Sequence, residues 1–199
     1  MVDKYKIKIV FLSWLFSFML TSCRLPDKKS ELLPVLSSTD LSVIENGDFI
    51  LRKGQGIVSS LIIDYLNDST GFSHIGVLIK ENDFIYVIHS IGIEFSNKEG
   101  VQQCTLGDFV SEAKSGEIII VRNKKSSNAE IADVAKEYLA KNIPFDRSFD
   151  FNDTTAFSCL ELPYHILERL GGNYKELVNF RAFTDSSLYE VILDRRSMN

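Results

Sequence analysis

The sequence predicts a single α+β domain that follows a short N-terminal segment. Two runs of β-branched and aromatic residues, His74 to Ile79 and Phe84 to His89, are separated by four polar residues and predict a β-hairpin. Residues Ala129 to Leu139 carry apolar side chains at helical spacing, which predicts an amphipathic helix. The chain has 199 residues, of which 45% are hydrophobic and 25% charged, and these values suit one globular domain.

The charge and the cysteine content argue against several classes of protein. A formal net charge of -5, with lysines scattered along the chain, lacks the basic footprint that phosphate binding needs, so we expect no nucleic-acid partner. Three cysteines are too few for a disulfide-built mini-protein, and none forms the CxxC pair of a zinc knuckle. Each cysteine is therefore considered separately.

The first residues have the pattern of a secretory signal. Three lysines precede an apolar run from Ile9 to Leu20, which is shorter than the roughly 20 residues that a membrane-spanning helix needs. The run ends in Leu20-Thr21-Ser22-Cys23, which resembles the lipobox of bacterial lipoproteins. This interpretation makes residues 1–22 a lipoprotein signal peptide and Cys23 the lipidated residue, with membrane lipid as a partner. Arg24 then favours the outer membrane, facing the periplasm, as the location in the cell envelope. A plain signal peptide with an unmodified Cys23 is the alternative.

Residues 23–46 are expected to be the lipidated cysteine and a tether, because prolines and polar residues interrupt any sustained period. The alternative is an N-terminal arm that packs on the domain through its scattered apolar residues, Leu32, Leu33, Leu36 and Val43. The domain itself is expected over residues 47–199.

Within the domain, strand signals recur between turn residues. Besides the hairpin, strands are expected at Phe49 to Leu51, Ile91 to Phe95 and Glu117 to Val121. Helices are expected at Ile57 to Leu66, from Thr105 onward, at Ala129 to Leu139 and at Cys159 to Leu170, before Gly171-Gly172. Asn142 to Phe157 is expected to be a loop over a site, and Asn173 to Asn199 receives no assignment.

Cys159 is the first candidate for chemistry, because it stands where a helix should begin. Ser158 and Glu161 have the Ser-x-x-Glu spacing of a capping box. A thiol at a helix N-terminus faces the positive end of the helix dipole, which should lower the thiol pKa and activate a nucleophile. The alternative is a small buried apolar residue.

Two histidines could complete such a site. His74 and His89 lie at the ends of the two hairpin strands, so their imidazoles could meet and supply a base and an orienting group, while Gly76 permits a close approach. The alternative is that both are structural, as we expect for His165. The two histidines and Cys159 could also bind zinc, but no tight spacing supports a metal site, and we expect no cofactor.

Five motifs together resemble a known family: Gly47-Asp48-Phe49-Ile50-Leu51-Arg52, Phe72-Ser73-His74-Ile75-Gly76-Val77, Val87-Ile88-His89-Ser90, Pro144-Phe145-Asp146 and Phe157-Ser158-Cys159-Leu160-Glu161-Leu162. The family is the YiiX/YebB-like cysteine hydrolases, permuted papain-like enzymes of the NlpC superfamily. The resemblance implies a circularly permuted papain-like fold, with an antiparallel sheet packed against helices and the catalytic cysteine at a helix N-terminus.

The same resemblance implies roles for individual residues. Cys159 would be the nucleophile and His74 the general base, while His89 stands where relatives have a glutamate. Ser158 and Glu161 would hold the start of the helix in place by capping it, or would bond within the site near the oxyanion. The backbone N–H of Cys159 would be the oxyanion donor. Cys104 is expected to be a core or surface residue, although a disulfide between it and Cys159 would abolish activity.

The resulting hypothesis is a cell-envelope lipoprotein with thiol hydrolase activity on a peptide or lipid amide or ester. The alternative is a non-catalytic binding or structural envelope lipoprotein that keeps the papain-like fold. His89-Ser90 in place of Glu-Ala, and Leu160 in place of a serine, motivate this alternative.

Overall fold

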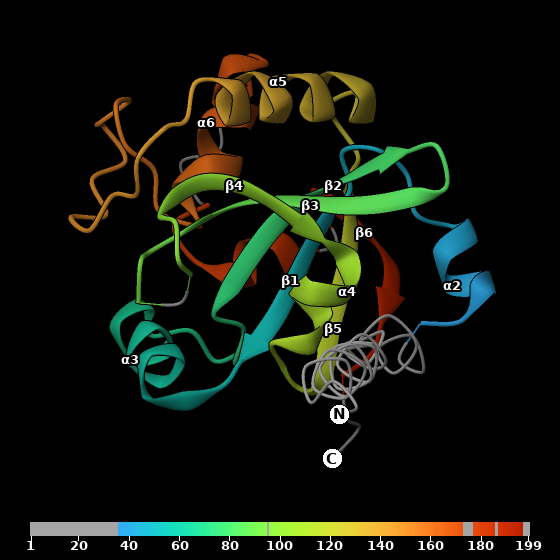
Figure 1. Ribbon diagram of the computed structural model, residues 1–199, viewed down its shortest axis with the longest axis horizontal. Helices are drawn as coiled ribbons and strands as arrows, with labels where there is room; N and C mark the ends of the chain where they lie inside the picture. Colours follow the sequence, from blue (N-terminus) through green and yellow to red (C-terminus); the bar gives the residue numbers. More distant parts are fainter. Residues whose placement is uncertain (1–35, 95, 173–176, 186, 197–199) are drawn as a thin grey trace, which may run out of the picture. The chain divides into compact units, whose positions relative to one another are not determined.

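The structure is a computed structural model that describes residues 36–94, 96–172, 177–185 and 187–196 (Figure 1). The predicted signal peptide, Cys23 and most of the predicted tether lie outside the described residues, so their predictions stay predictions. In the described part of the chain, every helix is too short or too polar to cross a bilayer.

A single six-stranded sheet forms the centre of the domain, with the strand order β4-β3-β2-β1-β5-β6 and antiparallel pairing throughout (Figure 1). The strands are β1 (Phe49–Gly54), β2 (His74–Glu81), β3 (Phe84–Ile91), β4 (Gly100–Thr105), β5 (Ala113–Asn123) and β6 (Tyr189–Asp194). The predicted antiparallel sheet is therefore confirmed.

Helices pack against both faces of this sheet. They are α2 (Ser38–Ser42), α3 (Gly56–Leu66), α4 (Leu106–Ser111), α5 (Asn128–Ala140), α6 (Glu161–Arg169) and the 3-10 helix η1 (Phe180–Thr184). Helices α5 and α6 share one hydrophobic cluster with the sheet, whereas α4 belongs to a second cluster on the other face. The fold is thus the predicted α+β class.

The alternation of side chains along β1 shows why its first three residues are all apolar. Phe49 and Leu51 enter the cluster beneath α5 and α6, and Ile50 enters the cluster beneath α4. Successive side chains of a strand point to opposite faces. Because both faces of this central strand are covered, each of the three positions is apolar and fully buried.

The predicted hairpin is present as β2 and β3, with Glu81 paired to Phe84 across a two-residue turn. Asn82 adopts a positive φ of 54° in this turn, a conformation that asparagine tolerates. A Cβ on Gly76 would lie 2.4 Å from Val87 Cγ1, so only glycine lets β2 and β3 approach this closely.

Three boundaries differ from the sequence expectations. The strand expected at Ile91 to Phe95 is wrong: β3 ends at Ile91, the chain turns at Ile93 and Glu94, and Phe95 lies outside the described residues. The next strand is β4, whose alternating exposed residues mark it as an edge strand. Helix α6 begins at Glu161 rather than Cys159, although Leu162 N already donates to Ser158 O at 3.2 Å.

The described part of the N-terminal arm packs on the domain. Leu36 and Ile44 are buried in the cluster beneath α4, and Ser37 caps α2 through Asp40. From residue 36 onward, the structure therefore fits an arm packed on the domain rather than a tether. Val43, which was expected to pack, is exposed instead. The unassigned tail contributes η1 and the edge strand β6.

Candidate active site

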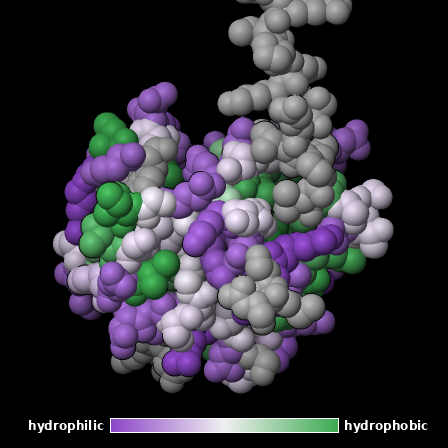
Figure 2. Space-filling model, turned by 90° about the horizontal axis from the view of Figure 1, so that it is seen from below, coloured by the Kyte–Doolittle hydropathy of each residue, from purple (hydrophilic) through white to green (hydrophobic). Residues whose placement is uncertain are grey.

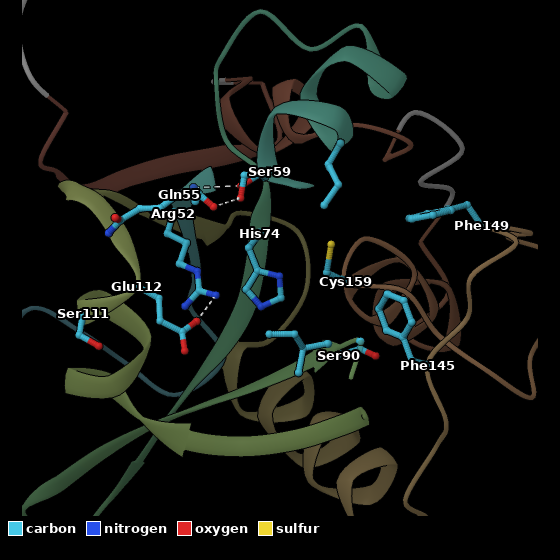
Figure 3. A pocket seen from close by; sticks show the side chains of 15 residues that line it. Arg52, Gln55, Ser59, His74, Ser90, Ser111, Glu112, Phe145, Phe149 and Cys159 are labelled. Atoms are coloured by element: carbon cyan, nitrogen blue, oxygen red, sulfur yellow. Dashed lines mark hydrogen bonds and ion pairs between the residues drawn. The ribbon is translucent and has the colours of Figure 1, made fainter. Parts of the chain in front are cut away.

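A cavity of about 390 Å³ opens where β1, β2, α3 and the start of α6 come together (Figure 3). The residues that line it are Arg52, Gly54, Gln55, Ser59, Ile62, Ser73, His74, Ser90, Ile91, Gly92, Ser111, Glu112, Phe145, Phe149 and Cys159. Two of the three predicted catalytic residues, Cys159 and His74, thus share one cavity. The sulfur faces it from the side of α6 and the imidazole from β2 (Figure 3).

Hydrogen bonds on both sides of Cys159 fix its position. Ser158 N donates to Glu161 Oε2 at 2.5 Å, and Glu161 N donates to Ser158 Oγ at 3.4 Å, which confirms the predicted capping box. One residue earlier, Phe157 O accepts a 2.5 Å bond from the buried Ser90 hydroxyl of β3. The segment that carries Cys159 is therefore attached both to its own helix and to the sheet.

The electrostatics of the thiol contradict the sequence expectation. Burial raises the pKa of Cys159 to about 12, because a thiolate loses its hydration in this cavity. The backbone N–H groups of Cys159 and Leu160 bond the sulfur and lower the pKa, as the helix-start argument predicted, but desolvation outweighs them. The expected depressed thiol pKa is wrong, and the resting group is a neutral thiol.

The two histidines contact each other directly. His74 Nε2 lies 2.8 Å from His89 Nδ1, and the rings are 5.0 Å apart in an edge-on arrangement. Burial first, and then the charge of Arg52, lower the pKa of His89 to about 3 and that of His74 well below 6.5. Both rings are therefore neutral, and one must donate to the other.

The tautomer of this pair decides what His74 can do. If His74 Nε2–H donates to His89 Nδ1, the Nδ1 atom of His74 carries a free lone pair and can accept a proton. In Figure 3, this second ring nitrogen of His74 lies on the side of Cys159. The arrangement of thiol, imidazole and orienting group is that of nucleophilic acyl-transfer sites.

Arg52 is the charged residue that sequence reasoning missed. It pairs with His74 across β1 and β2, is 5% exposed, and bonds Phe109 O at 2.8 Å and Glu112 Oε2 at 2.5 Å. The apolar motif before it, Phe49-Ile50-Leu51, indicates a buried strand, which could have marked an arginine at position 52 as unusual. Its charge opposes protonation of both histidines.

The remaining candidates lie outside this arrangement. Cys104 and Cys159 are both free, so the disulfide that would have abolished activity is absent. His165 is buried and stacks on Phe157 with centroids 4.6 Å apart, as expected of a structural histidine. Glu161 is buried too, and burial raises its pKa to about 7. Its hydrogen bonds with Ser158 lower the pKa, but the charge of Asp146 acts with burial to raise it.

Comparisons with known proteins agree with this fold. Residues 43–188 match the family described as permuted papain-like amidase enzyme, YaeF/YiiX, C92 family. The uncharacterized protein YiiX of Escherichia coli K12 is 26% identical over 148 residues, which are 72% of this chain and 67% of that protein. A crystal structure titled metalloprotein yiiX, from Escherichia coli O157:H7, superimposes with a TM-score of 0.61 and 18% identity.

That superposition covers 76% of this chain and 97% of the other, and it supports the predicted fold. The neighbour's title calls it a metalloprotein. In the residues described here, no three histidine, cysteine, aspartate or glutamate side chains are grouped so that they could hold a metal ion. His74, His89 and Cys159 do not form such a group, because the two imidazoles bond each other instead. The described residues thus do not fit a bound metal.

Proposed function

This chain belongs to the permuted papain-like amidases of the YaeF/YiiX, C92 family, and we propose that it hydrolyses an amide bond with Cys159 as the nucleophile and His74 as the general base. One observation carries the proposal. The 2.8 Å contact between His74 Nε2 and His89 Nδ1 occupies one nitrogen of the base and leaves the other for the thiol.

The reaction starts from neutral partners, because the thiol pKa is raised and the imidazole pKa lowered. As Sγ of Cys159 attacks the carbonyl carbon, its proton moves to Nδ1 of His74. The new imidazolium keeps its hydrogen bond to His89, which holds the ring in place as an acid residue does in other triads. His74 then gives the proton to the leaving nitrogen as the C–N bond breaks.

A thioester on Cys159 remains, and hydrolysis completes the cycle. Water loses a proton to His74 and attacks the thioester carbonyl. The C–S bond then breaks, His74 returns the proton to Sγ of Cys159, and the carboxylic acid leaves. The N–H groups of Cys159 and Leu160 bond the resting sulfur, and we propose them as the donors for the oxyanion. In other enzymes one such donor is worth about 3 kcal/mol.

A second function has a specific observation in its favour. A non-catalytic binding protein would also keep this fold, and the neutral, desolvated thiol and the histidine in place of a glutamate favour it. The two functions differ in whether the thiol becomes acylated. A binding protein would hold its ligand without forming a thioester.

The experiment uses the second thiol of the domain as an internal control. Burial also raises the pKa of Cys104 to about 12, so burial disfavours the thiolate at both cysteines. The protein is treated with p-nitrophenyl acetate at neutral pH and examined by mass spectrometry. If it is an enzyme, it should carry an acetyl group on Cys159 and none on Cys104. His74→Ala should abolish this adduct, whereas Cys104→Ser should leave it unchanged.

Equal labelling of both thiols, or labelling of Cys159 that survives His74→Ala, would show that His74 does not act as a base. The binding function would then be the better description. Acylation that depends on His74 would justify a search among peptide amides and lipid amides and esters for the natural substrate.

We further propose that the protein is a lipoprotein of the bacterial cell envelope, anchored through acyl chains on Cys23 in the outer membrane and facing the periplasm. The basic start, the apolar run and Leu20-Thr21-Ser22-Cys23 support this proposal. Mass spectrometry of the mature N-terminus should find Cys23 as the first residue, carrying acyl chains. Cys23→Ser should move the protein from the detergent phase to the aqueous phase.

A further inference from the structure

Helix α3 is apolar, yet it lies on the surface. Of the nine large apolar side chains exposed in the described part of the chain, four belong to this one helix: Ile57, Val58, Leu61 and Tyr65. We refer to these four residues as the α3 face. Ile57, Leu61 and Tyr65 follow one another at intervals of four and form a stripe along the helix.

This exposure is unusual for such a helix. Asp64 is the one charged residue of α3, and Ser59 is its one buried residue. A helix that is apolar around most of its circumference is normally buried in a core or in lipid. In Figure 2, apolar side chains appear as green patches on the left, the side on which α3 lies in Figure 1. Exposed apolar side chains that gather on one helix in this way indicate a partner.

The α3 face adjoins the candidate active site. Ser59 and Ile62 of the same helix line the cavity that holds Cys159. Phe149, another lining residue, packs on Tyr65 with ring centroids 5.7 Å apart. Whatever covers the α3 face therefore also borders the mouth of the cavity.

Two observations favour lipid as the occupant. The α3 face offers aliphatic side chains and one tyrosine but no basic side chain, and apolar residues with an amphipathic ring suit the boundary between headgroups and acyl chains. The proposed anchor, Cys23, stands 13 residues before Leu36, the first described residue. An extended chain of that length reaches about 45 Å at most, so the anchor would keep the domain next to a bilayer.

A second copy of the chain suits the observations less well. It would have to cover the helix whose Ser59 and Ile62 line the cavity, and would restrict access to Cys159 from that side. A lipid surface instead supplies amphipathic molecules at the mouth of the cavity.

We propose that the α3 face inserts into the surface of the lipid bilayer and holds the mouth of the cavity against it. The proposal goes beyond the proposed hydrolysis, since lipid contact requires no reaction at Cys159. It adds a second, non-covalent contact to the proposed lipid anchor and gives the domain a fixed orientation.

The test places a single tryptophan on the α3 face. Trp14 is the only tryptophan of the chain, so Trp14→Phe provides a background without one. Leu61→Trp adds the reporter to the full-length protein, and Phe84→Trp is the matched control. Phe84 is similarly exposed, at 52% against 59%, but it lies at the tip of the β2–β3 hairpin, far from α3 in Figure 1.

The variants are combined with phosphatidylcholine vesicles, with and without brominated acyl chains, and vesicle binding is checked by co-flotation. Bromine quenches tryptophan only within the bilayer. We expect at least a twofold loss of fluorescence for Leu61→Trp and no change for Phe84→Trp. The same result should hold in a Cys159→Ala background, which separates this proposal from the proposed hydrolysis.

Three results would overturn the proposal: no co-flotation, no quenching of Leu61→Trp, or equal quenching at both positions. Sedimentation of the same samples tests the second copy as occupant. A dimer that Ile57→Asp converts to a monomer, together with unquenched Leu61→Trp, would assign the α3 face to self-association.

Discussion

The hydrogen-bonded histidine pair should make the fold sensitive to mild acid, and His89→Gln should remove a large part of that sensitivity. Burial and the charge of Arg52 lower the pKa of His89 from 6.5 to about 3. In the unfolded chain the imidazole accepts a proton as the pH falls through 6.5, whereas in the folded chain it does so only near pH 3. Protonation of His89 therefore does not reduce the free energy of unfolding above pH 6.5. The free energy of unfolding then decreases progressively as the pH falls from 6.5 towards 3.

The size of the effect follows from the two pKa values. Each unit of difference corresponds to about 1.36 kcal/mol. Between pH 7 and pH 5, the unfolded chain gains a proton at this position that the folded chain does not bind, which costs about 2 kcal/mol of unfolding free energy. Glutamine can still accept a hydrogen bond from His74 Nε2–H, but it does not titrate.

Urea unfolding at pH 7 and pH 5, followed by far-ultraviolet circular dichroism, measures this difference. We expect the loss of unfolding free energy between the two pH values to be about 2 kcal/mol smaller in His89→Gln than in the unaltered protein. An equal loss in both would refute the reasoning, because it would mean that His89 is protonated as readily in the folded chain as in the unfolded one.

Gly76→Ala should lower the free energy of unfolding by about 1 to 3 kcal/mol, because the added Cβ would lie 2.4 Å from Val87 Cγ1 in a closely packed region. Thermal unfolding measures this loss. Gly107→Ala is its control, since that Cβ would have no neighbour closer than 3.8 Å, and equal losses would contradict the packing argument. Ser90→Ala removes the buried bond to Phe157 O and should cost about 1 to 3 kcal/mol of unfolding free energy as well as reduce kcat; an unchanged kcat would show that this bond does not position the nucleophile. Finally, kcat/KM should be flat between pH 6.5 and 9.0, because the imidazole pKa lies well below the first value and the thiol pKa, about 12, above the second. An acid limb near neutral pH would instead indicate a thiolate formed before substrate binds.

Local patterns were sufficient to predict most of the fold. The β2–β3 hairpin and helix α5 have strong periodicity, and their sequences predict them within a few residues. Strand β4 was missed because Gln102, Gln103 and Cys104 do not read as a buried strand, and it lies at the sheet edge where polar side chains are tolerated. The strand expected at Ile91 to Phe95 is wrong because the local pattern does not show where β3 ends. Its end at Ile91 follows from the pairing of β3 with β4.

The positions of the site residues were easier to predict than their electrostatics. His74 and His89 could be placed together from the hairpin alone, and Cys159 from the capping box. The pKa values depend on burial by α3, α4 and the loop before α6, and on the charge of Arg52. Arg52 is distant from both histidines in the sequence, but the pairing of β1 with β2 places it beside His74. No local pattern carries that information.

The burial of Cys159 also affects how long the protein stays intact. Oxidation by hydrogen peroxide proceeds through the thiolate and needs access to the sulfur. Burial raises the pKa of the thiol to about 12, so the thiolate is scarce at pH 7, and the residue is only 5% exposed. The sulfur is therefore protected from conversion to sulfenic acid by burial and by its raised pKa. A reactive low-pKa cysteine would need a reducing partner to survive in an oxidising compartment, whereas this thiol resists damage through its own surroundings.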